Sequence, residues 1–172
     1  VAEKERREVS VPPAGPEEPF LHARTELAMT RFSHHLIVSM AQGGSEALDA
    51  AALNGPVPCA GAHLYGTNLV TLAASAKPYV SRELPDGIGF ELRGGQRLVF
   101  DYHALNTGAA PTHVEHRLNL HYVERIEKPA RTFGFYNQYI QIPPHSDRSF
   151  VDECLLDDDV LVWALSRHTH RH

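Results

Sequence analysis

Cysteine is scarce in this sequence, since Cys59 and Cys154 are the only two among 172 residues. Zinc fingers are held by several thiolates, so a cysteine-based zinc finger is excluded. The two thiols could form one disulfide in an exported protein, or both could remain free and buried; the sequence leaves these alternatives open. No apolar leader follows Val1. We nevertheless expect a protein that acts outside the cytoplasm, either secreted or periplasmic.

Long apolar runs and an excess of basic residues are also missing. No apolar segment approaches the roughly 20 residues that span a bilayer, so we expect no membrane span. Lys plus Arg number 16 against 21 Asp plus Glu, which gives a net charge of −5 and no basic block. This balance gives no reason to expect a nucleic acid as partner.

Two common catalytic motifs are absent. No Gly-x-Ser-x-Gly segment is present to place a nucleophilic serine at a strand-to-helix turn. The pair Gly94-Gly95 lacks the Gly-x-x-x-x-Gly-Lys frame that holds phosphates. Methionine is limited to Met29 and Met40, and we expect Met40, which follows an apolar run, to be a core residue.

The residues that are present predict an all-β protein. Residues 1–19 are charged and then proline-rich, which indicates a flexible linker or lead-in arm before one domain over residues 20–172. Short apolar or alternating runs, with turn signals between them and no long helical period, favour an antiparallel β-sandwich or barrel. We expect Arg93–Gln96 to form a hairpin-type connection. The predicted strands are Arg31–Met40, Leu69–Ala74, Arg97–Leu105, Val114–Val123, Gly134–Ile142, Ser149–Leu156 and Val160–His170.

Histidine is the abundant residue. Twelve of 172 residues are histidine, about three times a typical share of roughly 2%, and histidine is the commonest metal ligand near neutral pH. Residues i and i+2 of a strand share a face, so His168 and His170 can bind one metal ion from a single strand. The alternative is that they are two polar residues on a solvated face.

Two further positions are candidate ligands. Adjacent residues on a regular strand face opposite ways, so His34 and His35 can bind one ion only where the backbone is irregular or the strand ends. Otherwise one belongs to the core and one to the surface. His103 ends a strand of apolar and aromatic residues, where a hydrogen-bonded structural histidine is the alternative. The remaining histidines have no spacing that requires a metal, and we interpret them as surface residues or as supports for a site: His22, His63, His113, His116, His121, His145 and His172.

The order of several motifs resembles one known family. From about Phe20 to the end, the chain is similar to the copper type II, ascorbate-dependent monooxygenases, whose familiar members are peptidylglycine α-hydroxylating monooxygenase and dopamine β-monooxygenase. Each motif alone is modest, and their order makes the resemblance fairly specific. The motifs are His34-His35-Leu36-Ile37-Val38, Leu84–Phe90, Leu98–His103, Ile142-Pro143-Pro144, Cys154 and His168-Thr169-His170.

The resemblance implies a jelly-roll-like β-sandwich with two copper sites. An electron-transfer copper would be held by His34, His35 and His103. A second copper, at which O₂ binds and a substrate C–H bond is hydroxylated, would be held by the catalytic pair His168 and His170 with a methionine. Ascorbate would reduce both coppers, and the substrate would be a peptide or a small molecule.

The chain departs from the family pattern at the methionine ligand. The family's methionine ligand lies in a second domain that this chain does not include, and neither Met29 nor Met40 occupies the matching position. We therefore expect the second site to be incomplete here and a second domain of the same protein to be a partner. The alternatives are a non-catalytic copper-binding module for storage, sensing or partner binding, and a β-sandwich interaction domain that binds no metal.

Overall fold

The computed structural model describes residues 5–10, 18–42, 57–58, 69–135, 137 and 139–167. Contacts divide the chain into two units, Val1–Phe133 and Gly134–His172. Every strand of the described residues lies in the first unit. The candidate ligands His34, His35 and His103 lie in that unit too, so its fold determines their geometry.

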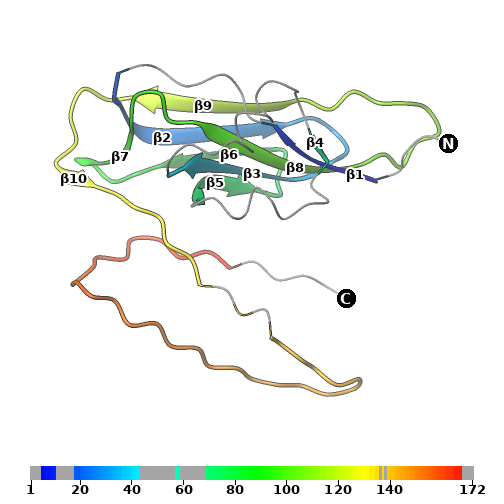
Figure 1. The fold of residues 1–172 in the computed structure, drawn as a ribbon. Helices are drawn as coiled ribbons and strands as arrows, with labels where there is room; N and C mark the ends of the chain where they lie inside the picture. The colour runs from blue at the N-terminus through cyan, green and yellow to red at the C-terminus, as the bar shows by residue number, and fades with distance from the viewer. Residues whose placement is uncertain are drawn as a thin grey trace. The chain divides into compact units, whose positions relative to one another are not determined.

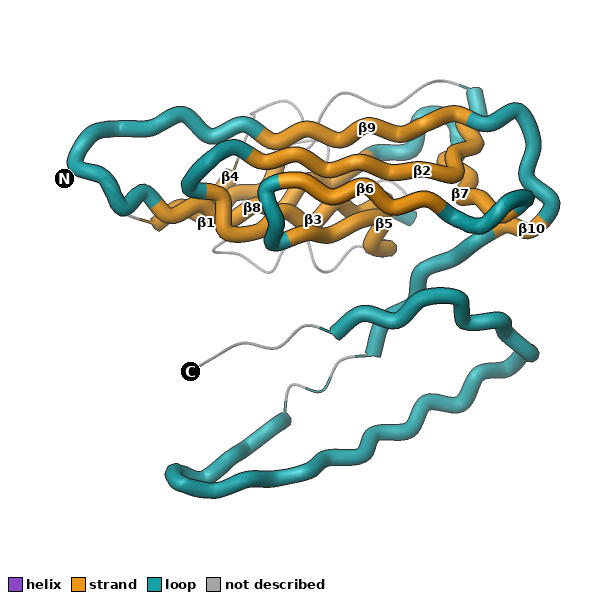
Figure 2. The backbone as a smooth tube through the Cα atoms, turned by 180° about the vertical axis from the view of Figure 1, so that it is seen from behind, coloured by secondary structure: helices purple, strands orange, loops and turns teal. Residues whose placement is uncertain are grey.

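The first unit contains two layers of β-strands, which Figures 1 and 2 show from opposite sides. The first sheet has the order β4-β1-β8-β3-β5, and all its pairings are antiparallel. This sheet carries the predicted His-His pair on β3 and His103 on β8. Its strands are β1 (Glu5–Ser10), β3 (Ser33–Ala41), β4 (Val57–Pro58), β5 (Leu69–Ser75) and β8 (Leu98–Leu105).

The second sheet is centred on β2, which pairs with β9 along one edge and with β6 and β7 along the other. These pairings are antiparallel, and only the short β10 pairs in parallel, with β7, among the described strands. The predicted antiparallel β-sandwich is therefore confirmed, while the jelly-roll-like connectivity remains a prediction. The strands are β2 (Phe20–Met29), β6 (Tyr79–Glu83), β7 (Ile88–Leu92), β9 (His116–Tyr122) and β10 (Lys128–Pro129).

The core lies between the two sheets and follows the alternation of the sequence. Leu27 of β2 and Leu36 and Val38 of β3 are almost fully buried against one another. Full burial of such a side chain stabilises the fold by roughly 1.5–3 kcal/mol. On β8, Phe100 and Tyr102 also pack on this cluster. Because successive strand residues face opposite ways, His103 projects from the outer face of the first sheet.

Two sequence predictions in the first unit differ from the structure. Arg93–Gln96 does turn, with Gln96 N–H donating to the Arg93 carbonyl over 3.0 Å. However, the turn connects β7 of one sheet to β8 of the other, so it is a crossover and not a hairpin. Residues 5–10, which the sequence placed in a lead-in arm, form β1 between β4 and β8. A charged sequence can form a strand when a neighbouring edge supplies its backbone hydrogen bonds.

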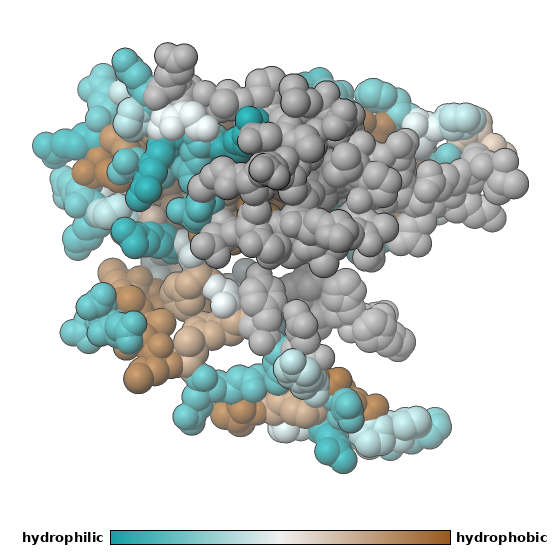
Figure 3. Space-filling model, in the orientation of Figure 1, coloured by the Kyte–Doolittle hydropathy of each residue, from teal (hydrophilic) through white to brown (hydrophobic). Residues whose placement is uncertain are grey.

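The second unit has no strand among residues 134–135, 137 and 139–167, so the strands predicted there are wrong for the described residues. Strand propensity is not enough, because a strand needs a neighbour for its backbone hydrogen bonds. Large apolar side chains are exposed in this unit, including Tyr139 at 89% and Leu155 at 90%, and apolar surface is visible in Figure 3. The single domain predicted for residues 20–172 remains a prediction.

A membrane-crossing helix must be both long and apolar. The described part of the chain contains none that is both long enough and apolar enough.

Candidate metal centre

The site lies at the corner where the chain passes from the second sheet to the first. Residues 30–32 connect β2 to β3, and Phe32 adopts a φ of 74°, a conformation uncommon for a bulky residue. The Phe32 carbonyl accepts a 2.7 Å hydrogen bond from Leu105 N–H, which attaches the turn to the end of β8. The starting residues of β3 and the last residues of β8 are therefore held side by side.

A β-bulge at His34 brings the two adjacent histidines to the same side. Ser33 pairs with Ala104 and His35 pairs with His103, so β3 advances by two residues while β8 advances by one. The extra residue is His34. A bulge breaks the alternation of a strand and redirects a side chain. The irregular backbone that the sequence required for two adjacent ligands is therefore present.

The three imidazoles converge on one another. One ligand nitrogen from each of His34, His35 and His103 lies within 4.8 Å of the other two. The ring centroids are 4.9 Å apart for His34 and His103, 5.4 Å for His35 and His103, and 5.2 Å for His34 and His35, each pair edge to face. The structure thus brings together three of the five predicted ligands from two neighbouring strands.

These distances are close to those around a transition-metal ion. Imidazole nitrogens bind zinc at about 2.0–2.1 Å in a tetrahedral arrangement, so neighbouring ligand nitrogens are about 3.3 Å apart. Nitrogens that lie within 4.8 Å of one another therefore need to close by up to about 1.5 Å to hold such an ion. The Nδ1 atoms of His34 and His35 are 3.0 Å apart. If both bound one ion at that bond length, they would subtend about a right angle at it.

Burial differs among the three rings. His103 is 5% exposed, His35 is half-buried and His34 is exposed. The ring of His103 therefore forms the floor of the cluster, and His34 lies on its solvent side. The donor set consists of imidazole nitrogen atoms, without a carboxylate or a thiolate among its three residues. Such a set matches copper, zinc, iron or nickel, and does not match magnesium or calcium, which prefer oxygen.

The other predicted site residues are not described. His168 and His170 lie outside the described residues, as do Cys59 and His63, so the second copper site remains a prediction. Cys154 is a free, exposed thiol. Met29 and Met40 are both buried in the core, which confirms the prediction for Met40.

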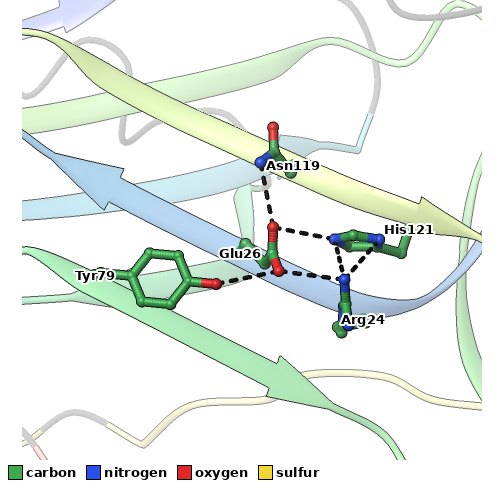
Figure 4. Close-up of polar contacts among 5 residues, drawn as sticks. All are labelled: Arg24, Glu26, Tyr79, Asn119 and His121. Carbon is green, nitrogen blue, oxygen red and sulfur yellow. Dashed lines mark hydrogen bonds and ion pairs between the residues drawn. The ribbon is translucent and has the colours of Figure 1, made fainter.

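His121 belongs to a separate polar cluster on the outer face of the second sheet (Figure 4). Its Nε2 lies 3.1 Å from Glu26 Oε2. Tyr79 hydroxyl and Asn119 Nδ2 donate to the same carboxylate over 3.1 and 3.2 Å. Arg24 Nη2 lies 3.1 Å from His121 Nδ1 and 3.3 Å from Glu26 Oε1. The hydrogen bonds from His121 and Asn119 lower the pKa of Glu26, so the carboxylate stays ionised and keeps the cluster together.

His22 is a core histidine, unlike the surface or supporting position expected from the sequence. It is 0% exposed, and its ring stacks on Phe90 with centroids 5.4 Å apart. Burial lowers its pKa to about 4, so it is neutral near pH 7. A register shift between His22 and Arg24 turns His22 inward while Arg24 faces out. The sequence carries no signal for this bulge.

The geometry identifies three histidines that could hold a metal ion, whereas the sequence comparisons identify no relative of the chain. No protein-family model matches the sequence, and a comparison with curated proteins finds no match either.

Proposed function

We propose that the His34, His35 and His103 cluster binds copper and serves as the one-electron site of an ascorbate-dependent monooxygenase. The observation that carries this proposal is the convergence of three imidazoles at a β-bulge. The bulge turns two adjacent histidines toward a third on the neighbouring strand, and this arrangement is specifically suited to holding one ion. On a regular strand, two adjacent histidines would face opposite ways and could not both turn toward a third on the neighbouring strand.

The chemistry of the donors favours copper over most other ions. Among divalent first-row metals, copper binds a given nitrogen site most tightly, and imidazole is a good ligand for copper. A bound copper would supply a one-electron couple, while the three histidines would fix its position. The buried ring of His103 would shield one side of the ion, and the exposed His34 would leave an approach for a reductant such as ascorbate.

The catalytic part of the proposal extends to His168 and His170. With a methionine from a second domain, they would hold the copper at which O₂ and a peptide or small-molecule substrate meet. The order of motifs along the sequence supports this part.

A non-catalytic copper-binding module is the second candidate. The observation in its favour is that all three imidazoles come from one unit, Val1–Phe133. A module for copper storage, sensing or partner binding would need no further ligand from the chain.

Copper stoichiometry and spectroscopy test the proposed site. When copper(II) is added, the wild-type chain should bind about one copper ion at this cluster. Its electron paramagnetic resonance spectrum should then show hyperfine coupling to nitrogen. His34→Ala should lose this signal without risk to the fold, because His34 is exposed. The matched control is His113→Ala, an exposed histidine outside the cluster. The proposed site is rejected if the wild-type chain binds no copper, or if His113→Ala loses copper while His34→Ala retains it.

Oxygen consumption separates the two candidates. A chain that includes the second domain should consume O₂ with ascorbate and a peptide or amine substrate, and should stop when His34 is replaced. Tight copper binding without substrate-dependent oxygen uptake would favour the binding module.

A further inference from the structure

His116 lies inside the sandwich, behind the two strands that carry the candidate metal centre. It begins β9 and pairs with Met29 of β2. Leu118, two residues further along β9, packs on the core, so the alternation of the strand directs His116 inward as well. His116 is half-buried, and burial lowers its pKa. It is therefore a neutral imidazole inside the sandwich near pH 7.

His116 contacts both strands that carry the candidate ligands. Its Nε2 forms a 3.1 Å hydrogen bond with Ser33 Oγ, and Ser33 is the residue immediately before the bulged His34. Its ring packs against Tyr102 with centroids 4.6 Å apart, and Tyr102 immediately precedes His103. One side chain of the second sheet thus touches the residue before the His-His pair and the residue before the third histidine.

The position of His116 is itself fixed by the corner. Glu115 N–H donates to Thr30 Oγ1 over 2.8 Å, and Thr30 N–H donates to the Glu115 carbonyl over 3.0 Å. This pair joins the start of β9 to the turn that leads into β3. A shift of β9 relative to the turn would break both bonds, so His116 is held in place beneath Ser33 and Tyr102.

We propose that His116 is a positioning residue that sets the spacing of the His34, His35 and His103 ligands through Ser33 and Tyr102. This inference rests on the proposed metal-binding function. The hydrogen bond to His116 keeps Ser33 on the inner face of the first sheet. Because the bulge follows Ser33 directly, His34 then lies on the outer face. The contact of His116 with Tyr102 fixes the register of β8, so that His103 lies opposite His35. Mutation of a group that holds a metal ligand in place typically lowers metal affinity by about 10–100-fold.

The test uses Ser33→Ala and His116→Phe. Ser33→Ala removes the hydroxyl from the bond, and His116→Phe removes the nitrogen but retains a ring against Tyr102. Ser33→Thr, which retains a hydroxyl, is the conservative variant. His121→Phe is the matched control, because His121 lies on the same strand as His116 and faces the other side. The unfolding free energy of each metal-free variant is measured alongside.

Copper(II) affinity, measured by competition with a chelator, should fall about tenfold in Ser33→Ala and in His116→Phe. The double variant should lose little more than either single variant, because both remove the same bond. Ser33→Thr should restore the affinity, and His121→Phe should leave it unchanged. The hyperfine coupling of the bound copper should change in the two variants, a readout that a general loss of stability would not move.

The metal-free chain gives an independent readout. Ring proton NMR shifts of His34, His35 and His103 should move in Ser33→Ala, while those of His121 should not. Should wild type bind no copper, the proposed function fails, and these shifts alone decide the positioning role. Unchanged ring shifts and unchanged affinity would overturn the inference, as would an equal loss of affinity in His121→Phe. If His116→Phe does not fold, the comparison of Ser33→Ala with Ser33→Thr decides.

Discussion

The outer faces of the two sheets each carry a polar cluster that contains histidine, and the clusters differ in what the imidazole meets. On the second sheet, His121 meets the Glu26 carboxylate and the Arg24 guanidinium, so both of its ring nitrogens have hydrogen-bonding partners. On the first sheet, the nitrogens of His34, His35 and His103 converge on one another. An imidazole paired with a carboxylate is fixed in a network of opposite charges, whereas a group of converging imidazoles without a carboxylate could hold a metal ion.

The comparison is tested most strongly by removing two ligands at once. His34→Ala combined with His35→Ala should weaken copper(II) binding by at least about a hundredfold, because loss of even a group that only supports a ligand typically costs about 10–100-fold. His121→Ala should leave copper affinity unchanged. Chelator competition on the folded proteins measures both. Equal losses in the two proteins would show that the clusters do not differ as proposed.

His22 occupies a third kind of environment, because neither ring nitrogen of this buried histidine has a hydrogen-bond partner among the described residues. Its pKa falls from 6.5 to about 4 on burial, so the unfolded chain binds more protons than the folded chain between these values. Stability is complete above about pH 6.5 and falls as the pH drops toward 4, by up to about 3 kcal/mol from this group.

Denaturant unfolding across that range measures the effect. His22→Leu, which cannot be protonated, should remove most of the pH dependence between pH 6.5 and 4.5. His116, whose pKa is also lowered by burial, contributes with the same sign and should retain its part in the variant. A slope that is unchanged in His22→Leu would mean that His22 is solvated in the folded protein.

The cluster around Glu26 should contribute to stability and not to metal binding. Tyr79→Phe removes one hydrogen bond to the Glu26 carboxylate, and should lower the unfolding free energy by about 1 kcal/mol or less. Copper affinity should not change. Thermal unfolding and a copper titration of the same sample measure both quantities. A loss of copper affinity with the fold intact would link the two outer faces.

These environments were only partly predictable from the sequence. The predicted strands Arg97–Leu105 and Val114–Val123 match β8 and β9, because an alternating period-2 pattern follows directly from strand geometry. The requirement of an irregular backbone at His34 and His35 was also predictable, because a single ion cannot be reached from both faces of a strand.

The sequence-based predictions that differ from the structure share one physical cause. The bulge that buries His22 and the crossover at Arg93–Gln96 depend on how distant strands pair, and no local residue pattern encodes them. The partners of His116 lie on two other strands, far away in sequence. Strand-like composition after Gly134 did not produce strands in the described residues, because no neighbouring strand supplies their hydrogen bonds.

The smallest expected effect concerns the strained residue beside the candidate metal centre. Phe32 has a φ of 74°, and its ring lies 5.0 Å from the Arg31 guanidinium. Phe32→Asn places a residue there that tolerates this conformation. It also loses a cation–π contact that contributes about 0.5–1 kcal/mol. These terms oppose each other, so the unfolding free energy should change by less than about 1 kcal/mol.

Phe32→Val provides the contrast, because a β-branched residue is disfavoured at positive φ and also loses the ring. It should be the less stable of the two variants in denaturant unfolding. Copper affinity should follow the backbone: Phe32→Asn should retain it, since the Leu105 N–H bond to the residue 32 carbonyl is unaffected by the side chain. If Phe32→Asn loses copper while it stays folded, the aromatic ring itself, and not the turn, places the imidazoles.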